Sequence, residues 1–267
     1  MPKDDYLANL PETEVAAWYN RLADFFGKNK IQGQTPLASI FLKEYLKNRN
    51  PKKTFRFSAP IYLQNLPKVT DTLKFHRKVF LTEEKARFTG GRRSWAGIVP
   101  RLQGKSPYQK WDLNKTKSMA MHYESLVEIG AGIMDIRRIQ YRGTPAERDI
   151  FGSLRGFQLK STVNVTGSVL PDSKVKIVFS SWICEVNDKY DFASVEHLTV
   201  PNPDFKRHDL KNAVEPDKET IRVYHTNAKR LVKAKMASPF LIKSYGWSVT
   251  NRMMTQPAVI DPKKNLR

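Results

Sequence analysis

The sequence predicts an α+β protein in which N-terminal helices precede a region rich in antiparallel strands. Two patterns predict this class. Apolar residues recur at helical spacing in the first 50 residues, and they alternate with polar residues from 156 to 186. The 267 residues suffice for one large domain or two small ones with a real core. We expect a helical and basic N-terminal region at residues 1–119 and an α+β domain at 120–267.

Two helices are expected in the first 50 residues. The first begins near Pro11 and stops at Gly27, and the second has Thr35 as its N-cap and Pro36 in its first turn. The apolar residues on their faces are Val15, Trp18, Leu22, Phe25, Phe26, Leu37, Ile40, Phe41 and Tyr45. The pattern is typical of two helices packed on a core, and a pair of helices lying on a membrane is the alternative.

Residues 51–117 are interrupted by prolines and glycines, with a short helix expected at 70–81. Between residues 90 and 111, cations such as Arg92, Arg93, Arg101 and Lys105 are interleaved with aromatic side chains. This mixture suits contact with phosphates or an anionic lipid surface, and the alternative is a solvated basic loop with buried tryptophans. Residues 118–141 mix the apolar periods of a helix and of a strand, so helix and strand are both retained as alternatives there.

From Gly156 onward the pattern favours strands. Residues 157–165 and 175–186 alternate, and Pro171-Asp172-Ser173 supplies a turn, which together predict a long antiparallel hairpin. Its second strand leads directly into Asp188. A short β-branched run follows at 220–224, and a helix is expected at 227–237, ending before Pro239.

The net charge of +20 favours polyanionic partners, namely nucleic acid, an anionic membrane or a phosphate-bearing substrate. Residues 51–120 carry 16 basic and 4 acidic side chains, so the charge is regional. The single cysteine, Cys184, excludes an internal disulfide and suits a reducing cytoplasm. No stretch approaches the roughly 20 apolar residues of a spanning helix, and the polar N-terminus lacks a signal-peptide region. We therefore expect a protein made in the bacterial cytoplasm and exported or injected by other machinery.

The most informative motif is Asp188-x-Tyr190-Asp191 followed by five residues and His197. Two carboxylates, a phenol and an imidazole can together hold a divalent cation, activate a nucleophile and protonate a leaving oxygen. In the alternative interpretation, Asp188 and Asp191 cap a turn after the hairpin and Tyr190 lies in the core. Cys184 falls inside a predicted strand and is expected to be inert. The chain has no glycine-rich phosphate loop, HExxH helix or CxxC pair.

This motif resembles the signature of the colicin-M-type bacteriocins, which is Asp-x-Tyr-Asp, five residues, then His-Arg at a strand end in an open β-structure. The resemblance covers residues 155–230 and implies that the domain at 120–267 is an antiparallel, open β-barrel-like catalytic domain. It further implies an enzyme that hydrolyses lipid II between undecaprenyl and pyrophosphate, with Mg²⁺. It implies that Asp191 is the nucleophile or general base and that Asp188 binds metal or orients the site, with both carboxylates as possible metal ligands. Tyr190 would position the site, and His197 would act as an acid or phosphate ligand.

The chain departs from that signature at one position, where Leu198 replaces the arginine. The arginine is expected near the anionic substrate, so another cation would have to take its role. The candidate substrate-binding residues are Lys206, Arg207 and Arg222.

The runs 197–205 and 223–230 also resemble an uncharacterised bacterial family linked to toxins and secretion systems. This resemblance implies an antibacterial effector of the type VI secretion kind that acts in the target periplasm. Its partners would be lipid II in the inner membrane, an anionic membrane surface and a cognate immunity protein. Two other classes remain open: a basic nucleic-acid-binding protein or nuclease that uses residues 51–120, and a non-catalytic adaptor of a secretion apparatus.

Overall fold

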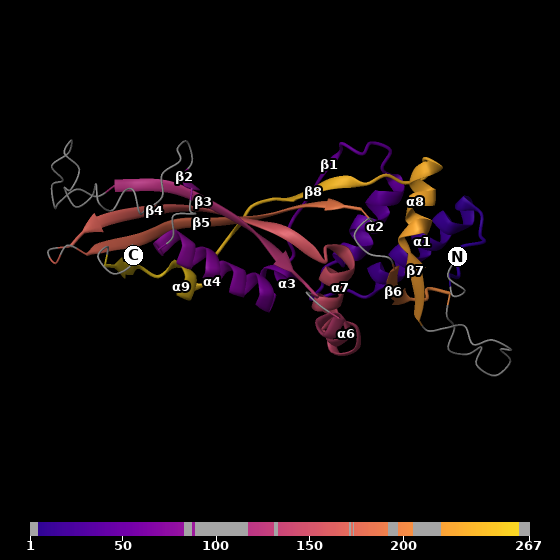
Figure 1. Cartoon of the computed structure of the whole chain (residues 1–267), viewed down its shortest axis with the longest axis horizontal. Helices are drawn as coiled ribbons and strands as arrows, with labels where there is room; N and C mark the ends of the chain where they lie inside the picture. The colour runs from indigo at the N-terminus through magenta and orange to yellow at the C-terminus, as the bar shows by residue number, and fades with distance from the viewer. Residues whose placement is uncertain are drawn as a thin grey trace. The chain divides into compact units, whose positions relative to one another are not determined.

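The structure, a computed structural model, describes residues 5–82, 87–88, 117–130, 133–170, 172, 174–191, 197–204 and 220–261. It contains both helices and strands, which confirms the predicted α+β class (Figure 1). The helices are α1 (Glu12–Lys28), α2 (Leu37–Lys47), α3 (Ile61–Gln64), α4 (Pro67–Thr82), α6 (Ile133–Arg142), α7 (Pro145–Ser153), α8 (His225–Lys233) and α9 (Arg252–Thr255). The strands are β1 (Thr54–Phe57), β2 (Arg87–Phe88), β3 (Lys117–Glu128), β4 (Gly156–Val169), β5 (Val175–Tyr190), β6 (His197–Pro201), β7 (Thr220–Tyr224), β8 (Phe240–Ser244), β9 (Trp247–Ser248) and β10 (Ala258–Ile260). Within the described ranges, no helix has the length and apolar character needed to cross a membrane.

The chain forms two compact units, and neither is continuous in sequence. The first unit comprises Met1–Arg56, Glu128–Gly156 and Asp188–Lys243. The second unit comprises Phe57–Val127, Phe157–Asn187 and Ser244–Arg267. The boundary expected between residues 119 and 120 divides the chain in a different way, and it stays a prediction.

The largest sheet has eight strands in the order β1-β8-β5-β4-β3-β2, with β9 and β10 also paired to β5. The N–H of Leu241 donates to the carbonyl of Lys53. Four residues further along both strands, the N–H of Tyr245 donates to the carbonyl of Phe57, so β1 runs parallel to β8. The pairs β2–β3, β4–β5, β5–β9 and β5–β10 are antiparallel.

In the described part of the chain this mixed sheet does not close, and β1 and β2 are its outer strands. The expected antiparallel, barrel-like arrangement is therefore corrected to an open mixed sheet. The reason is physical: a period of two fixes which face of a sheet each side chain occupies, but it says nothing about whether the outer strands meet.

The long hairpin is confirmed as β4 and β5. Its register runs from Gln158 opposite Asn187 to Val169 opposite Val175, with one irregularity between Asn164 and Val165. Both strands extend beyond the predicted alternation. The inward face of β4 is apolar except at Ser161, which is fully buried. That exception proves important because a polar residue on a buried face needs a partner.

The expected helix at 70–81 is confirmed as α4, which runs along β4 and β5 (Figure 1). The ring of Phe80 meets the ring of Trp182 edge to face with centroids 5.7 Å apart. Arg77 lies over the ring of Phe179 and donates to the carbonyls of Met254 and Gln256. These contacts pack α4 against the hairpin within the second unit.

His76 of α4 is completely buried, and both of its ring nitrogens are hydrogen-bonded. Nδ1 lies 2.7 Å from the Oγ of Ser161, and Nε2 lies 2.7 Å from the Oγ of Ser125. Burial lowers the pKa of His76 to about 4, because a charged ring at this position would lack the water that stabilises it in solution. The imidazole is therefore neutral at neutral pH.

In the first unit, the two N-terminal helices are confirmed as α1 and α2, but the predicted cap of α2 is wrong. The hydroxyl of Thr35 accepts a hydrogen bond from Lys30 instead. The first turn of α2 is capped by Asp149 of α7, whose Oδ2 and Oδ1 accept from the N–H groups of Leu37 and Ala38, each at 2.9 Å. Sequence could not reveal this cap because it comes from a residue more than a hundred positions away.

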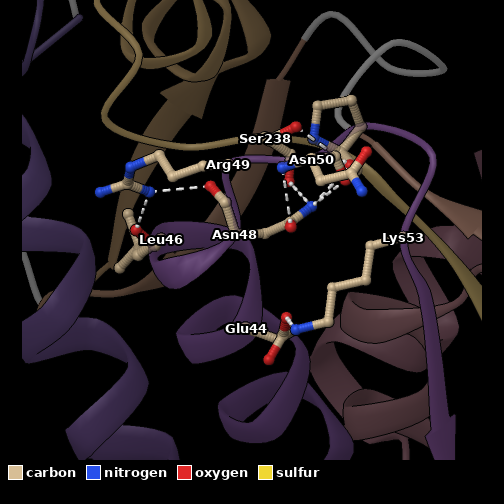
Figure 2. A network of polar contacts seen from close by, with 8 residues as sticks. Glu44, Leu46, Asn48, Arg49, Asn50, Lys53 and Ser238 are labelled. Carbon is tan, nitrogen blue, oxygen red and sulfur yellow. Dashed lines mark hydrogen bonds and ion pairs between the residues drawn. The ribbon is translucent and has the colours of Figure 1, made fainter.

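The other end of α2 is fixed by the buried side chain of Asn48 (Figure 2). Its amide nitrogen donates to the carbonyls of Asn50, Ser238 and Pro239, and its oxygen accepts from the N–H of Asn50. In Figure 2 this network joins the end of α2 to the segment that leads into β8. One side chain therefore satisfies several backbone groups that would otherwise be buried without partners.

The undecided stretch at 118–141 contains both structures, β3 followed by α6. Between them Gly130 has a φ of +83°, and a Cβ there would meet the Phe151 ring at 2.7 Å. Only glycine fits both constraints. The helix expected at 227–237 is displaced: α8 begins at His225 and ends at Lys233, and Lys235 has a φ of +59°.

We predict that Asp149→Ala lowers the free energy of unfolding by about 2 kcal/mol, because two N–H groups at the start of α2 lose a charged acceptor. Denaturant titration at pH 7 measures the loss. Asp71→Ala serves as a control, since Asp71 is an exposed carboxylate that pairs with the nearby Lys74, and the change should alter stability by less than about 0.5 kcal/mol. Equal effects of the two changes would contradict the role of Asp149.

We also predict that His76 makes the protein less stable in acid. Its folded pKa lies below the ordinary value, so the unfolded chain binds a proton that the folded chain excludes. The contribution of neutral His76 to the free energy of unfolding is fully present above pH 6.5. It falls as the pH drops toward 4, by about 3 kcal/mol at most. Denaturant titrations of the wild type and His76→Gln measure this as a difference between the two proteins. The difference should be flat above pH 6.5, and a flat difference down to pH 4 would contradict the prediction.

Candidate functional site

The candidate site lies at the C-terminal end of β5, in the first unit. Along this strand Val186 and Tyr190 are buried and Lys189 is exposed, as period-two alternation requires. Asp188 lies on the same face as Val186 and Tyr190, and Lys189 and Asp191 lie on the other. The two carboxylates of the motif thus leave the strand end from different faces.

Tyr190 is held in an aromatic cluster. Its ring stacks on Phe240 at a centroid distance of 5.3 Å and meets Phe41 and Tyr45 edge to face at 5.7 and 6.0 Å. Only 7% of its surface is exposed. Burial, with a smaller effect of the nearby Tyr45 and Asp149, raises the pKa of Tyr190 well above its usual range. Its phenol therefore stays protonated, and the ring anchors the residues on either side of it.

Asp188 is half-buried, and burial raises the pKa of its carboxyl to about 7. The backbone N–H of Lys189 partly offsets this by hydrogen bonding, while the negative charge of Asp191 raises the pKa further. A carboxyl with a pKa near neutrality can both hold and release a proton under physiological conditions, which is the property expected of an acid–base group.

The side chain of Asp191 is held by Lys189, which comes two residues earlier and lies on the same face. Its Oδ2 lies 2.9 Å from the Nζ of Lys189, and the side chain of Asp191 is only 24% exposed. Its charge also raises the pKa of the Tyr45 phenol, after the larger effect of burial. Asp191 is thus close enough to both Asp188 and Tyr45 to influence them electrostatically.

His197 begins β6, where its backbone pairs with Tyr224 of β7. Its side chain and residues 192–196 lie outside what the structure describes, so the expectation that its imidazole joins the carboxylates stays a prediction. Arg222, opposite Thr199 in the same two-stranded sheet, is exposed. The other candidate cations, Lys206 and Arg207, and the basic stretch at 90–111 also lie outside the described residues.

The structure adds residues that the motif alone did not indicate. Lys189 is the ion-pair partner of Asp191, and Phe41 and Phe240 enclose Tyr190. The signal for Lys189 was available, because residues two apart on a strand share a face. No local signal could have indicated Phe41 or Phe240, which are distant in sequence.

Among the described residues there is no group of three or more potential metal ligands. The two motif carboxylates are the donors present at this strand end. No family model matches the chain, and no curated protein or solved structure is significantly similar to it.

We predict that Asp188 destabilises the protein as it ionises. The pKa of Asp188 in the folded protein lies above its value in the unfolded chain. The contribution of Asp188 to the stability of the protein is therefore fully present below about pH 4 and is lost as the pH rises to about 7. The loss amounts to a few kcal/mol and stops above pH 7. Denaturant titrations of wild type and Asp188→Asn should converge at acid pH and separate up to pH 7, with the variant more stable. A constant difference from pH 4 to 8 would show that Asp188 has an ordinary pKa.

Proposed function

We propose that this chain is an antibacterial toxin that hydrolyses lipid II between undecaprenyl and pyrophosphate, and that a secretion system delivers it. The proposal rests on the spacing Asp188-x-Tyr190-Asp191-x5-His197. The observation that carries it is the pair of unlike carboxyl groups at the end of β5, one with a pKa near 7 and one in an ion pair with Lys189. Two carboxyl groups in different environments can divide acid and base roles between them.

In the proposed reaction, Asp191 is the nucleophile or activates water against the ester bond, and Lys189 holds its carboxylate in place. Asp188 orients the site and exchanges a proton near neutral pH, while His197 protonates the leaving oxygen or contacts phosphate. Mg²⁺ is commonly held by one or two carboxylates and the phosphates of a substrate, so one carboxylate, that of Asp188 or of Asp191, would hold it together with the pyrophosphate, whose charge it would offset.

Tyr190 positions the site in this proposal. Its ring is fixed by Phe41, Tyr45 and Phe240, so the backbone of the neighbouring aspartates is held by the core of the first unit. The net charge of +20 favours approach to the anionic bilayer that contains lipid II, at about 1 kcal/mol per surface cation. A cognate immunity protein in the producing cell is a further expected partner.

We predict that Asp191→Ala lowers the rate of lipid II cleavage by about 10²–10⁴-fold, because no other group can replace its carboxylate. The assay follows release of undecaprenol from purified lipid II in detergent with Mg²⁺. Asp172→Ala is a matched control, since Asp172 also pairs with a lysine two residues away, at 2.6 Å, but lies in the hairpin turn. A folded Asp191→Ala protein with full activity would remove the assignment.

Expression in two compartments separates the proposed function from its alternatives. The wild type should lyse a susceptible bacterium when directed to the periplasm and should be tolerated in the cytoplasm. Toxicity in the cytoplasm with loss of DNA or RNA would support the nuclease instead, and absence of toxicity in both compartments would support the adaptor.

A further inference from the structure

A second polar constellation lies in the second unit, and we call it the serine–histidine cluster: Ser125, His76, Ser161 and Cys184. His76 comes from α4, and the others come from the adjacent strands β3, β4 and β5. His76 contacts a serine hydroxyl at 2.7 Å through each ring nitrogen. Ser161 and Cys184 face each other in the strand register, with Oγ and Sγ 3.5 Å apart.

The direction of these hydrogen bonds follows from what each group can donate. A thiol is a weak donor, so the better assignment has the Ser161 hydroxyl donate to the Sγ of Cys184. The Oγ of Ser161 then accepts from Nδ1–H of His76. A neutral imidazole carries one N–H, so Nε2 is left as an acceptor for the hydroxyl of Ser125.

Ser125 is the end of this chain of hydrogen bonds that lies nearest to the surface. His76, Ser161 and Cys184 are fully buried, whereas Ser125 is half-buried. Beside it, Tyr123 shares its face of β3 and meets the His76 ring at 5.0 Å. The ring of Phe75, 41% exposed, lies 6.0 Å from that of Tyr123. The half-buried Ser125 thus adjoins an aromatic surface that suits an apolar group.

We propose that Ser125 is a catalytic nucleophile, that His76 is its general base, and that the substrates are carboxylic esters with an aromatic or other apolar acyl group. A hydroxyl within hydrogen-bond reach of an imidazole that a third group orients is the arrangement that activates serine. Ser161 is the positioning residue. This activity would be additional to lipid II hydrolysis and does not depend on it.

The proposed reaction has two balanced steps. The Oγ of Ser125 forms a bond to the ester carbonyl carbon while its proton passes to Nε2 of His76. The bond from that carbon to the alcohol oxygen breaks, and the alcohol takes the proton from Nε2. Water then attacks the acyl-serine, His76 accepts its proton and returns it to Ser125, and the carboxylic acid leaves.

Two electrostatic features bear on this division of roles. Burial lowers the pKa of His76 to about 4, so the ring is uncharged at neutral pH and Nε2 keeps its lone pair, while the same burial makes the ring a weaker proton acceptor than an exposed histidine. Burial raises the pKa of the Cys184 thiol to about 12, so Cys184 stays protonated and is a poor nucleophile. The serine is therefore the reactive group of the cluster.

A fluorophosphonate probe tests the proposal on the full-length protein at pH 7.5. The Oγ of Ser125 should bond to phosphorus with release of fluoride, and peptide mass spectrometry should locate the adduct on Ser125. Ser125→Ala should lose the label, while Ser180→Ala, which changes an exposed serine of β5, should keep it. No adduct on the folded wild type, or an adduct only at another serine, would overturn the proposal.

The positioning role of Ser161 is tested separately. Ser161→Ala should slow labelling by about 10²-fold, because the imidazole loses the acceptor that fixes its tautomer. Ser161→Thr, which keeps a hydroxyl, should restore most of the rate. Circular dichroism checks that both variants fold. If the alanine variant is folded and labels at the wild-type rate, the cluster is structural and the proposal fails.

Discussion

The first unit depends on a single buried carboxylate. Asp149 accepts the first two N–H groups of α2 and so fixes where that helix begins, while Asn48 fixes where it ends. Because α2 is held at both ends, Phe41 and Tyr45 occupy defined positions around Tyr190. The end of β5, and with it the placement of the motif carboxylates, follows from this clamp. A loss at Asp149 would therefore reach the proposed site without any direct contact with substrate.

The first unit contains several carboxyl groups that interact with one another and with buried phenols, although the protein as a whole has a net positive charge. Asp149, Asp188 and Asp191 each influence, or are influenced by, the buried phenols of Tyr45 and Tyr190 or by one another. Each carboxyl meets a different environment. Asp149 accepts backbone N–H groups, Asp191 pairs with Lys189, and Asp188 experiences mainly burial, which raises its pKa to about 7. In the second unit, burial acts in the opposite direction on His76, since there the charged form is the protonated one.

The sequence predicted what is encoded locally. The two N-terminal helices, α4 and the long hairpin each follow from a periodic pattern within one segment. The cap of α2, the parallel pairing of β1 with β8 and the open edges of the sheet depend on residues far apart in the chain, and no local pattern encodes them. For the site, spacing identified the residues and strand alternation could have added Lys189. The aromatic enclosure of Tyr190 is the packing that the alternative interpretation of the motif expected, and it is compatible with a positioning role. The serine–histidine cluster was missed, although Ser161 stood out on an apolar strand face.

The discontinuity of the first unit has a consequence for how the protein is made. The last of its three segments ends at Lys243. Within the unit, the ion pair between Arg21 and Asp204 joins residues 183 positions apart. Such distant contacts form slowly, because a long loop must close before they contribute. A ribosome would have to synthesise Phe240 before Tyr190 could find its stacking partner. The strand end that carries the motif is thus assembled only after Phe240 has emerged, and a product truncated before that residue would lack it.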